Sequence, residues 1–269
     1  MILVTGATGN VGRHVVDGLV AAGAPVRALS RTPKPGFVRG DLREPDSLSG
    51  PLDGVDTVFL LWPGPDATGA EAAVEALAKG VRRIVYLSAI AAEAGFWGRI
   101  EKAIETTEVA EWTFLRAGGF ATNTLGWADM IRADGVVRWP YGQAARSLIH
   151  ERDLADVAVR TLIEDGHAGH RYDLTGPDLV TQADQVKQIG EAIGRDVRWA
   201  EVPSGVARQQ LIQAWGDEAF VDGALTYWAS LLQHPEPVTR TVEQLTGRPA
   251  RTFRQWARDH AADFGGAVT

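Results

Sequence analysis

The first half of the chain alternates short apolar runs with segments of helical periodicity. Between the apolar runs, apolar residues recur every three or four positions, as in the Ala/Glu-rich stretch 66–79. Such alternation is typical of a parallel sheet with helices on both faces. The expected strands are 2–5, 26–30, 57–61, 83–88 and 113–116, and the expected helices are 13–22, 66–79 and 99–108.

The second half of the chain is less regular. Residues 153–164 and 181–194 have helical periodicity, residues 171–174 and 198–202 are expected to be extended, and the tryptophan-rich stretch 209–232 is expected to be helical. No internal repeat or clean linker separates this half from the first. We therefore expect residues 1–150 to form one domain, with its sheet completed by part of 151–180. Residues 151–269 should form a mixed α/β region that packs onto it.

A glycine-rich turn, TGATGNVG at residues 5–12, joins the first expected strand to the first expected helix. Glycines at these spacings let the backbone leave a buried strand sharply, approach a pyrophosphate closely and pack the next helix. The phosphates would bind at the N-terminus of that helix, where free N–H groups and the helix dipole favour negative charge. The alternative is a tight turn without a ligand. The nucleotide-binding residues predicted here are Gly6, Thr8, Gly9, Asn10, Val11 and Gly12.

The end of the second expected strand bears on which dinucleotide binds. A site for NAD usually has an acid about 20 residues beyond the glycines, which accepts hydrogen bonds from the ribose 2′-hydroxyl. Here Ser30, Arg31 and Thr32 are followed by Lys34 without an acid, and a guanidinium can pair with a 2′-phosphate. We therefore expect NADP(H) in preference to NAD(H), unless Arg31 is only a solvated loop residue. Asp41 is expected near the adenine, or else as a helix N-cap.

Composition excludes several classes of function. The absence of cysteine excludes disulfides, thiolate metal sites and cysteine nucleophiles, and the scattered histidines suggest no metal site. The formal net charge of −7 without basic runs argues against a nucleic-acid surface. No signal peptide or long apolar span is evident, so we expect a cytoplasmic protein that does not bind membranes. The absence of a G-x-S-x-G elbow argues against a hydrolase.

Further motifs, in order along nearly the whole chain, resemble those of the NmrA-like group of atypical short-chain dehydrogenase/reductases. The resemblance implies an α/β Rossmann fold, a doubly wound parallel sheet with a smaller C-terminal substrate-binding region, and a preference for NADP(H). Leu61 and Trp62 are then expected to border the cofactor. Members of the group reduce quinones, azo dyes, imines or phenolic ethers, and others bind the cofactor only to sense redox state. Besides the glycine turn, the motifs are VRALSR at 26–31, GDL at 40–42, LSA at 87–89, TFLRAG at 113–118, IHERDLA at 149–155, LTGP at 174–177 and TGRP at 246–249.

The chain departs from the wider superfamily at the proton donor. A standard short-chain dehydrogenase carries Tyr-x-x-x-Lys on the helix after the serine of the fifth strand. Ser88 and Lys102 match this pattern by position, but Gly98 stands where the tyrosine would be. We expect Ser88 and Lys102 to be catalytic and to contact the cofactor, with Lys102 as an electrostatic stabiliser or a donor through water. The alternatives are a turn-capping hydroxyl for Ser88 and a surface ion pair with Glu105 for Lys102.

The missing tyrosine narrows the chemistry. Hydride transfer to a ketone leaves a localised alkoxide that must be protonated or stabilised, whereas quinones and enones give delocalised anions and an iminium gives a neutral amine. We therefore expect an NADPH-dependent reductase of a conjugated or aromatic acceptor: a quinone, enone, imine or azo compound. The alternatives are a non-catalytic NADP(H)-binding redox sensor and an enzyme that uses the site for isomerisation or cyclisation.

Nine tryptophans favour a small, planar organic substrate. The protein is expected to be a monomer or a homodimer. Aromatic faces stack on planar ligands and exclude water, although core packing is the alternative for each ring. Trp62, in the rigid loop 62–65, is expected to form a wall of the nicotinamide pocket. The candidate substrate residues are Trp62, Trp97, Trp127, Trp139 and Tyr141, with Trp215, Tyr227 and Trp228 as further aromatic candidates. The family resemblance implies that Phe120 and Asn123 face the same cleft.

Overall fold

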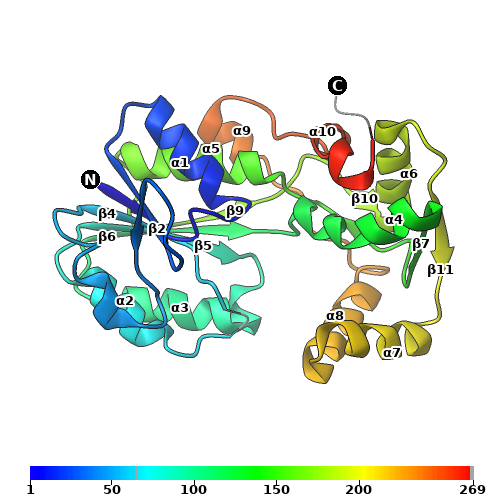
Figure 1. Cartoon of the computed structure of the whole chain (residues 1–269), viewed down its shortest axis with the longest axis horizontal. Coiled ribbons are helices and arrows are strands. Elements are labelled where there is room, and N and C mark those ends of the chain that lie inside the picture. The colour runs from blue at the N-terminus through cyan, green and yellow to red at the C-terminus, as the bar shows by residue number, and fades with distance from the viewer. Residues whose placement is uncertain (65, 267–269) are drawn as a thin grey trace. The chain divides into compact units, whose positions relative to one another are not determined.

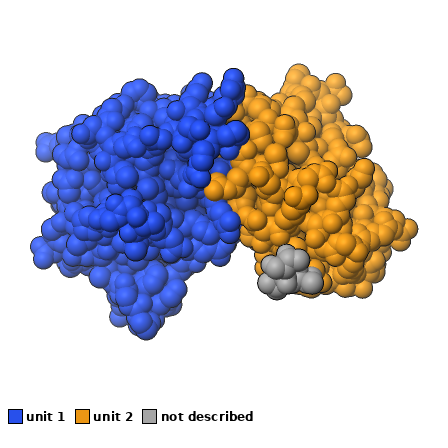
Figure 2. Space-filling model, turned by 90° about the horizontal axis from the view of Figure 1, so that it is seen from above, with its two compact units in different colours: residues 1–118, 151–174, 240–249 blue, residues 119–150, 175–239, 250–269 orange. Residues whose placement is uncertain are grey.

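The structure is a computed structural model that describes residues 1–64 and 66–266, and its chain divides into two units (Figure 2). Unit 1 consists of Met1–Gly118, Glu151–Leu174 and Arg240–Pro249, and unit 2 of Gly119–His150, Thr175–Thr239 and Ala250–Thr269. Residues 119–150, which were expected in the first domain, lie in unit 2. Residues 151–174, part of the stretch expected to complete the sheet of the first domain, lie in unit 1 and supply a helix and an edge strand to its sheet.

Unit 1 is built around a seven-stranded parallel sheet (Figure 1). The strand order is β3-β2-β1-β4-β5-β6-β9, so the direction of winding reverses between β1 and β4. This is the order of a doubly wound Rossmann sheet, and the expected fold class is confirmed. In such sheets, ligands bind at the carboxyl ends of the strands beside the reversal. The strands are β1 (Ile2–Val4), β2 (Val26–Ser30), β3 (Phe37–Arg39), β4 (Thr57–Leu60), β5 (Arg83–Ala89), β6 (Glu111–Ala117) and β9 (His170–Leu174).

Helices cover both faces of this sheet. One face carries α1 (Gly12–Ala21), α5 (Glu151–Ile163) and α9 (Thr241–Thr246), and the other carries α2 (Ala70–Ala78) and α3 (Phe96–Glu105) (Figure 1). Two short 3-10 turns, η1 (Pro45–Leu48) and η2 (Ala92–Ala94), lie in the connections. Apolar side chains of the strands, α2 and α3 form the core on the second face, which buries Leu3, Leu60, Leu77, Ile84, Ile100 and Phe114.

A buried arginine ties the start of β5 to the end of α5. The Arg83 guanidinium donates to the carbonyl oxygens of Leu162 at 3.3 Å and Glu164 at 2.8 Å. It also pairs with Glu111 at 2.6 Å and Asp165 at 2.7 Å. A cation placed at the carboxyl end of a helix satisfies carbonyl groups that have no partner in the helix and interacts favourably with the helix dipole.

Three expected helices differ by more than two residues from those in the structure. The helix expected at 66–79 begins only at Ala70, because Gly69 has a left-handed backbone with φ of 79°. The helix expected at 99–108 spans Phe96–Glu105. The stretch expected to be helical at 209–232 forms two helices, α7 (Ser204–Trp215) and α8 (Glu218–Ser230), because Gly216 has φ of 74° and ends the first.

Unit 2 contains two small sheets and several helices. β7 (Val136–Trp139) pairs in parallel with β11 (Arg198–Glu201), and β8 (Ala145–Arg146) pairs antiparallel with β10 (Val180–Thr181). No helix among the described residues has the length and apolar character needed to cross a bilayer. The other elements are η3 (Ala121–Trp127), α4 (Ala128–Asp134), α6 (Gln182–Ile193), α10 (Phe253–Asp259) and η4 (Ala261–Phe264), besides α7 and α8.

Two apolar clusters hold unit 2 together. The larger packs α4, α6 and α10 around buried rings such as Trp256 and Phe264. The smaller lies between α7 and α8 and buries Ala207, Leu211, Val221 and Leu225. We call the two helices of the smaller cluster, Ser204–Trp215 and Glu218–Ser230, the α7–α8 hairpin.

Candidate functional site

The glycine turn between β1 and α1 is packed so tightly that side chains do not fit at its key positions. Gly6 has a left-handed backbone with φ of 59°, and its carbonyl oxygen accepts a hydrogen bond from the Gly9 N–H at 2.9 Å. A Cβ atom at Gly12 would lie only 2.1 Å from that same oxygen. Glycine at position 12 therefore lets α1 begin directly against the turn.

The N-terminus of α1 offers hydrogen-bond donors to a ligand. Val11 occupies the N-cap position and contributes no side-chain hydrogen bond. Within residues 1–64 and 66–266, the backbone N–H groups of Asn10, Val11 and Gly12 have no hydrogen-bond acceptor. Free N–H groups at a helix start, next to a turn without side chains, fit a dinucleotide pyrophosphate.

Thr5 fixes the carboxyl end of β4 beside this turn. Its Oγ1 accepts a hydrogen bond from the Leu61 N–H at 2.8 Å and lies 3.2 Å from the Leu61 carbonyl oxygen, to which it donates. The Leu61 side chain packs against Gly6, with its Cβ atom 3.1 Å from the place where a Gly6 Cβ would be. Leu61 therefore borders the turn, and Thr5 is a positioning residue that sequence reasoning did not single out.

Trp62, the expected wall of the nicotinamide pocket, packs into the core of unit 1. Its side chain is buried in the apolar core of unit 1, and its indole N–H donates to the Asp66 carbonyl oxygen at 2.6 Å. This hydrogen bond holds Asp66 beside the ring; Pro65 lies outside the described residues. The structure therefore gives Trp62 a packing role.

Arg31 is exposed directly after β2. Among the residues that the structure describes, none forms an ion pair with its guanidinium. The Ser30 hydroxyl donates to the Thr32 carbonyl oxygen at 2.8 Å, which shapes the loop, and the Lys34 ammonium lies 4.6 Å from the Phe37 ring centre. A cation without an acidic partner at this strand end is available to a phosphate.

Asp41 follows β3 but does not cap a helix. Its carboxylate accepts a hydrogen bond from the Arg43 N–H at 2.9 Å, in a turn that precedes η1, whose N-cap is Glu44. The alternative prediction of a helix N-cap at Asp41 is therefore wrong. The reason is that the side chain closes a local turn two residues long before the helical turn begins.

Ser88 is buried and bound to a glutamate of α3. Its hydroxyl donates to Oε1 of Glu101 at 2.6 Å, and the same carboxylate accepts two hydrogen bonds from Arg116 of β6, at 3.0 and 2.6 Å. Ser88 and Glu101 are only 2% and 4% exposed, respectively. The hydrogen bonds to Glu101 raise the pKa of Arg116 above its ordinary value. The three side chains form a polar group that joins β5, β6 and α3, and Arg171 of β9 lies 4.0 Å from the same carboxylate.

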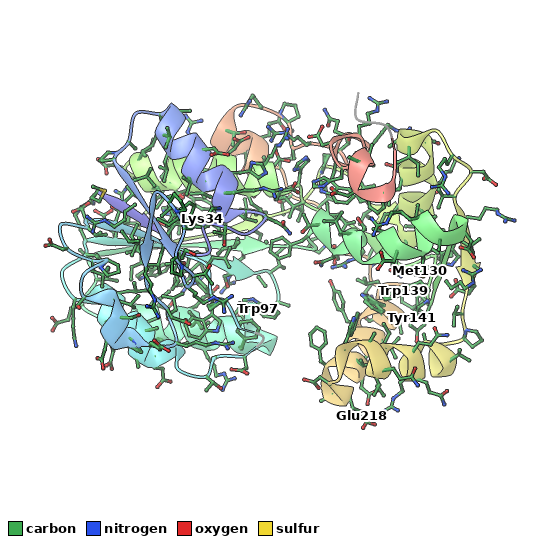
Figure 3. The ribbon with its side chains drawn as sticks, in the orientation of Figure 1. Lys34, Trp97, Met130, Trp139, Tyr141 and Glu218 are labelled. Carbon is green, nitrogen blue, oxygen red and sulfur yellow. The ribbon has the colours of Figure 1, made fainter. Side chains whose placement is uncertain are left out.

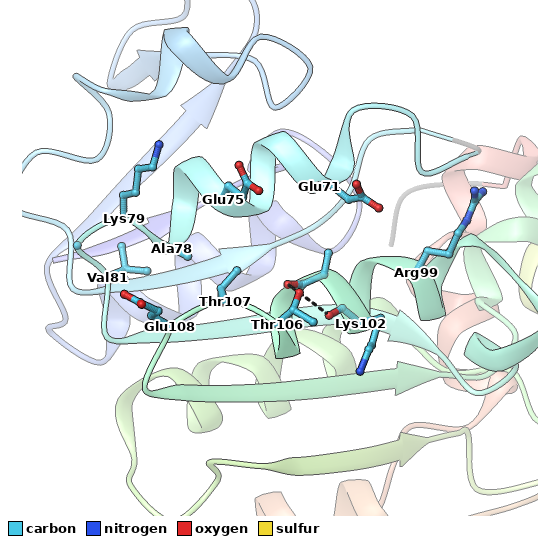
Figure 4. A pocket seen from close by; sticks show the side chains of 12 residues that line it. Glu71, Glu75, Ala78, Lys79, Val81, Arg99, Lys102, Thr106, Thr107 and Glu108 are labelled. Atoms are coloured by element: carbon cyan, nitrogen blue, oxygen red, sulfur yellow. Dashed lines mark hydrogen bonds between the residues drawn. The ribbon is translucent and has the colours of Figure 1, made fainter.

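Lys102 lies on the outer side of α3 and not beside Ser88. It is exposed and lines a surface groove of about 800 Å³ between α2 and α3 (Figure 4). Successive residues of a helix point about 100° apart, so Glu101 faces the sheet while Lys102 faces the groove. The alternative ion pair between Lys102 and Glu105 is also wrong, because Glu105 pairs with Arg171 of β9.

Gly98, where the tyrosine of the wider superfamily is missing, has no room for a side chain. A Cβ atom there would lie 2.5 Å from the Ala92 carbonyl oxygen, because η2 packs against the first turn of α3. Nearby, the ring of Trp97 (Figure 3) stacks with that of Phe96 at a centre distance of 4.2 Å, and both side chains are partly exposed. Packing therefore requires glycine at position 98.

The remaining candidate substrate residues lie in unit 2. Phe120 is partly exposed and precedes η3, and Asn123 is exposed on η3. Trp127 is buried in the larger core cluster, so its ring has a packing role. Trp139 and Tyr141 pack against the α7–α8 hairpin (Figure 3).

Glu201 holds the backbone after β7 in an unusual conformation. Tyr141 has a left-handed backbone with φ of 61°, a conformation that residues other than glycine rarely adopt. The Glu201 carboxylate accepts hydrogen bonds from the Tyr141 N–H at 2.5 Å, the Gly142 N–H at 3.0 Å and the Trp199 indole N–H at 2.8 Å. These three bonds fix the direction in which Tyr141 leaves the strand.

Comparisons with known proteins agree with an NAD(P)H-binding chain of this fold. A family model described as NAD(P)H-binding matches residues 6–165. A (4-alkanoyl-5-oxo-2,5-dihydrofuran-3-yl)methyl phosphate reductase of Streptomyces griseus is 40% identical, over 98% of this chain and 99% of its own. An NAD(P)H azoreductase of Xenophilus azovorans is 36% identical, over 99% and 100% of the two chains. A solved NADPH complex of an Escherichia coli quinone oxidoreductase is similar in fold, with a TM-score of 0.80 and 22% identity, over 96% and 99%.

Proposed function

Because the chain belongs to the NAD(P)H-binding family, within the NmrA-like atypical short-chain dehydrogenase/reductases, we propose that it is an NADPH-dependent reductase of a conjugated or aromatic acceptor. The chain is an NAD(P)H-dependent oxidoreductase, and the acceptor class is our inference: a quinone, enone, imine or azo compound. The observation that carries it is the lack of space for any side chain at Gly98.

Three parts of unit 1 would hold the cofactor. The free N–H groups of Asn10, Val11 and Gly12 would bind the pyrophosphate, and Leu61 would pack beside it at the end of β4. Arg31 would pair with the 2′-phosphate, which favours NADP(H) over NAD(H). The bound cofactor supplies the hydride. The chain's own contribution is to place the acceptor and to keep water from the reacting atoms.

The side chains near the end of β5 do not form a proton-donating group of the standard kind. The Ser88 hydroxyl is committed to Glu101, whose carboxylate is neutralised by Arg116. We therefore assign these three residues a positioning role that joins β5 to α3, and we assign Lys102 no contact with Ser88. An acceptor whose product anion is delocalised, or which yields a neutral amine, needs no such donor and can take its proton from water.

The relatives support the acceptor class. One is named as an azoreductase, and a solved structure of similar fold is named as a quinone oxidoreductase. A second candidate function, an NADP(H)-binding redox sensor without turnover, is favoured by the burial of Ser88. The two functions make opposite predictions about cofactor oxidation.

The test begins with calorimetric titration of the protein with NADPH and NADH. Nicotinamide absorbance is then followed with a naphthoquinone, a cyclic imine, an azo dye and, as a control, a simple aliphatic ketone. We expect tighter binding of NADPH and oxidation by conjugated acceptors only. Comparable turnover of the ketone would contradict the acceptor class. Binding without oxidation by any acceptor would favour the sensor.

A further inference from the structure

We propose that unit 2 carries a binding platform for the acceptor's ring, formed by Trp139, Trp215 and Trp228, which binds a planar ring bearing carbonyl or azo acceptor atoms. This rests on the proposed function, because it names where the conjugated acceptor binds. It goes beyond that function in one respect: the platform is complete within unit 2 and is therefore predicted to bind such rings without the cofactor.

The three indoles come from three different elements and contact one another. Trp139 ends β7, Trp215 ends α7 and Trp228 lies in α8. The ring centres are 5.5 Å apart for Trp139 and Trp228, and 6.3 Å apart for the other two pairs. The planes are inclined by 51° to 74°, so the rings meet edge to face or at a tilt, and no two of these indoles are stacked face to face. Trp215 is the most exposed of the three, so its indole offers aromatic surface on which a planar ligand can stack.

The platform continues into apolar surface that the fold leaves open. Trp215 is 41% exposed, and Phe220, whose ring centre lies 5.5 Å from that of Trp215, is 58% exposed. By contrast, Trp127 and Trp256 of the same unit are buried in its core. An exposed apolar patch of adjacent aromatic side chains, such as Trp215 and Phe220, is typical of an interaction or ligand-binding surface.

The indole N–H groups give this surface its polar specificity. Trp62 donates its N–H to Asp66, and Trp199 donates to Glu201. For Trp139, Trp215 and Trp228, the described residues provide no acceptor for the indole N–H. A ring with carbonyl oxygens or azo nitrogens can accept from such donors, whereas a plain hydrocarbon ring leaves them unpaired.

A buried carboxylate fixes α8 to the rest of unit 2. The Tyr227 hydroxyl donates to Glu236 at 2.6 Å, and Glu236 also accepts from the Arg146 guanidinium and the Ser147 N–H, each at 2.9 Å. Burial and the neighbouring Glu236 carboxylate raise the pKa of Tyr227 above its ordinary value, so its proton stays in this hydrogen bond at neutral pH. Since every residue named belongs to unit 2, the platform does not depend on unit 1 for its assembly.

The kinetic test compares kcat/KM for a two-ring acceptor, naphthoquinone, with that for the one-ring benzoquinone. We expect Trp215→Ala to lower the value for naphthoquinone by about fivefold to tenfold, and to lower that for benzoquinone by a smaller factor, because the single ring stacks over less area. Trp215→Phe should retain most of the wild-type preference for naphthoquinone over benzoquinone. Val206→Ala, which removes an exposed apolar group elsewhere on α7, should change neither value.

The binding test uses calorimetry with a water-soluble naphthoquinone sulfonate and no NADPH, on the full chain. We expect the wild-type protein to bind it and Trp215→Ala to weaken binding by about the same fivefold to tenfold. Circular dichroism verifies that the variant is folded. If it is not, Trp215→Phe and Trp228→Phe are tested instead, each by titration with a series of ligands that carry fluorinated rings. Equal binding by folded Trp215→Ala and wild type refutes the platform. Lost binding in that variant, with no acceptor reduced by the wild type, supports the platform while refuting the reductase.

Discussion

Replacing Gly12 by alanine tests the cofactor turn most directly, because the added methyl group would meet only backbone atoms. Its Cβ would lie 2.1 Å from the Gly6 carbonyl oxygen, 2.6 Å from the Gly6 carbonyl carbon and 2.9 Å from the Ala7 Cα. Ordinary contacts of this kind are 3.4–4 Å. No side-chain rotation can relieve the overlap, so α1 and the turn must move apart by more than an ångström.

The expected cost follows from this displacement. Forcing an extra methyl group into a packed region costs about 1–3 kcal/mol. In a protein of this size each kcal/mol lowers the melting temperature by about 2–4 °C. The movement also misplaces the free N–H groups of Asn10 and Val11. A hydrogen bond to a charged group contributes about 1.5–3 kcal/mol, so losing one should raise the Kd for NADPH by about tenfold to 150-fold.

Scanning calorimetry and titration with NADPH measure both effects. Gly50→Ala is the matched control, because nothing lies within 4 Å of a Cβ at that position and its backbone does not require glycine. Gly9→Ala should fall between the two, with its Cβ 3.2 Å from the Gly6 oxygen. The reasoning is refuted if Gly12→Ala matches Gly50→Ala in both melting temperature and NADPH affinity.

Three further predictions concern charged residues of unit 1. Arg31→Ala should weaken NADPH binding by about tenfold or more and leave NADH binding unchanged in calorimetry; equal losses would show that Arg31 does not meet the 2′-phosphate. Arg83→Met should lower the free energy of unfolding in urea by about 3–5 kcal/mol, because Glu111 and the end of α5 lose a buried cation, and a loss below about 1 kcal/mol would contradict this. Partial burial acts to raise the pKa of Glu111, but hydrogen bonds from Arg83 and Arg82 outweigh it and hold the pKa below its usual range. Its stabilising contribution is therefore complete above the unfolded pKa of about 4.3 and lost as the pH falls through the folded pKa, so Glu111→Gln should flatten the acid side of the curve of unfolding free energy against pH.

The sheet could be predicted because parallel strands that are buried on both faces consist of short, continuous runs of apolar residues. The helix ends could not, because single residues decide them. Gly69 and Gly216 lie within sequence of helical composition, and only their left-handed backbone shows that one helix starts late and another stops. The position of the Trp62 side chain could not be predicted either, because its indole N–H binds a backbone carbonyl, and the pattern of side chains does not reveal such a bond.

The turn between β1 and α1 could be predicted, because its proposed function depends on the backbone and the spacing of the glycines reveals that backbone conformation. The motif positions of Ser88 and Lys102 did not reveal that the two side chains point to different sides of α3, because position in a motif does not fix the phase of a helix. A signal for the true partner was present. Glu101 lies on the same buried stripe of α3 as Ile104, and Arg116 lies in the otherwise apolar end of β6. Two opposite charges on buried faces of neighbouring elements require each other.

The interleaving of the two units restricts how the protein can be taken apart or recombined. β9 and α5 belong to unit 1, yet they follow the first segment of unit 2 along the chain. A fragment ending at residue 150 would leave β6 with a bare edge, and unpaired strand edges recruit other chains and aggregate. A chimera that borrows the substrate region of a relative must therefore exchange 119–150, 175–239 and 250–269 together. A single splice point would produce two incomplete halves.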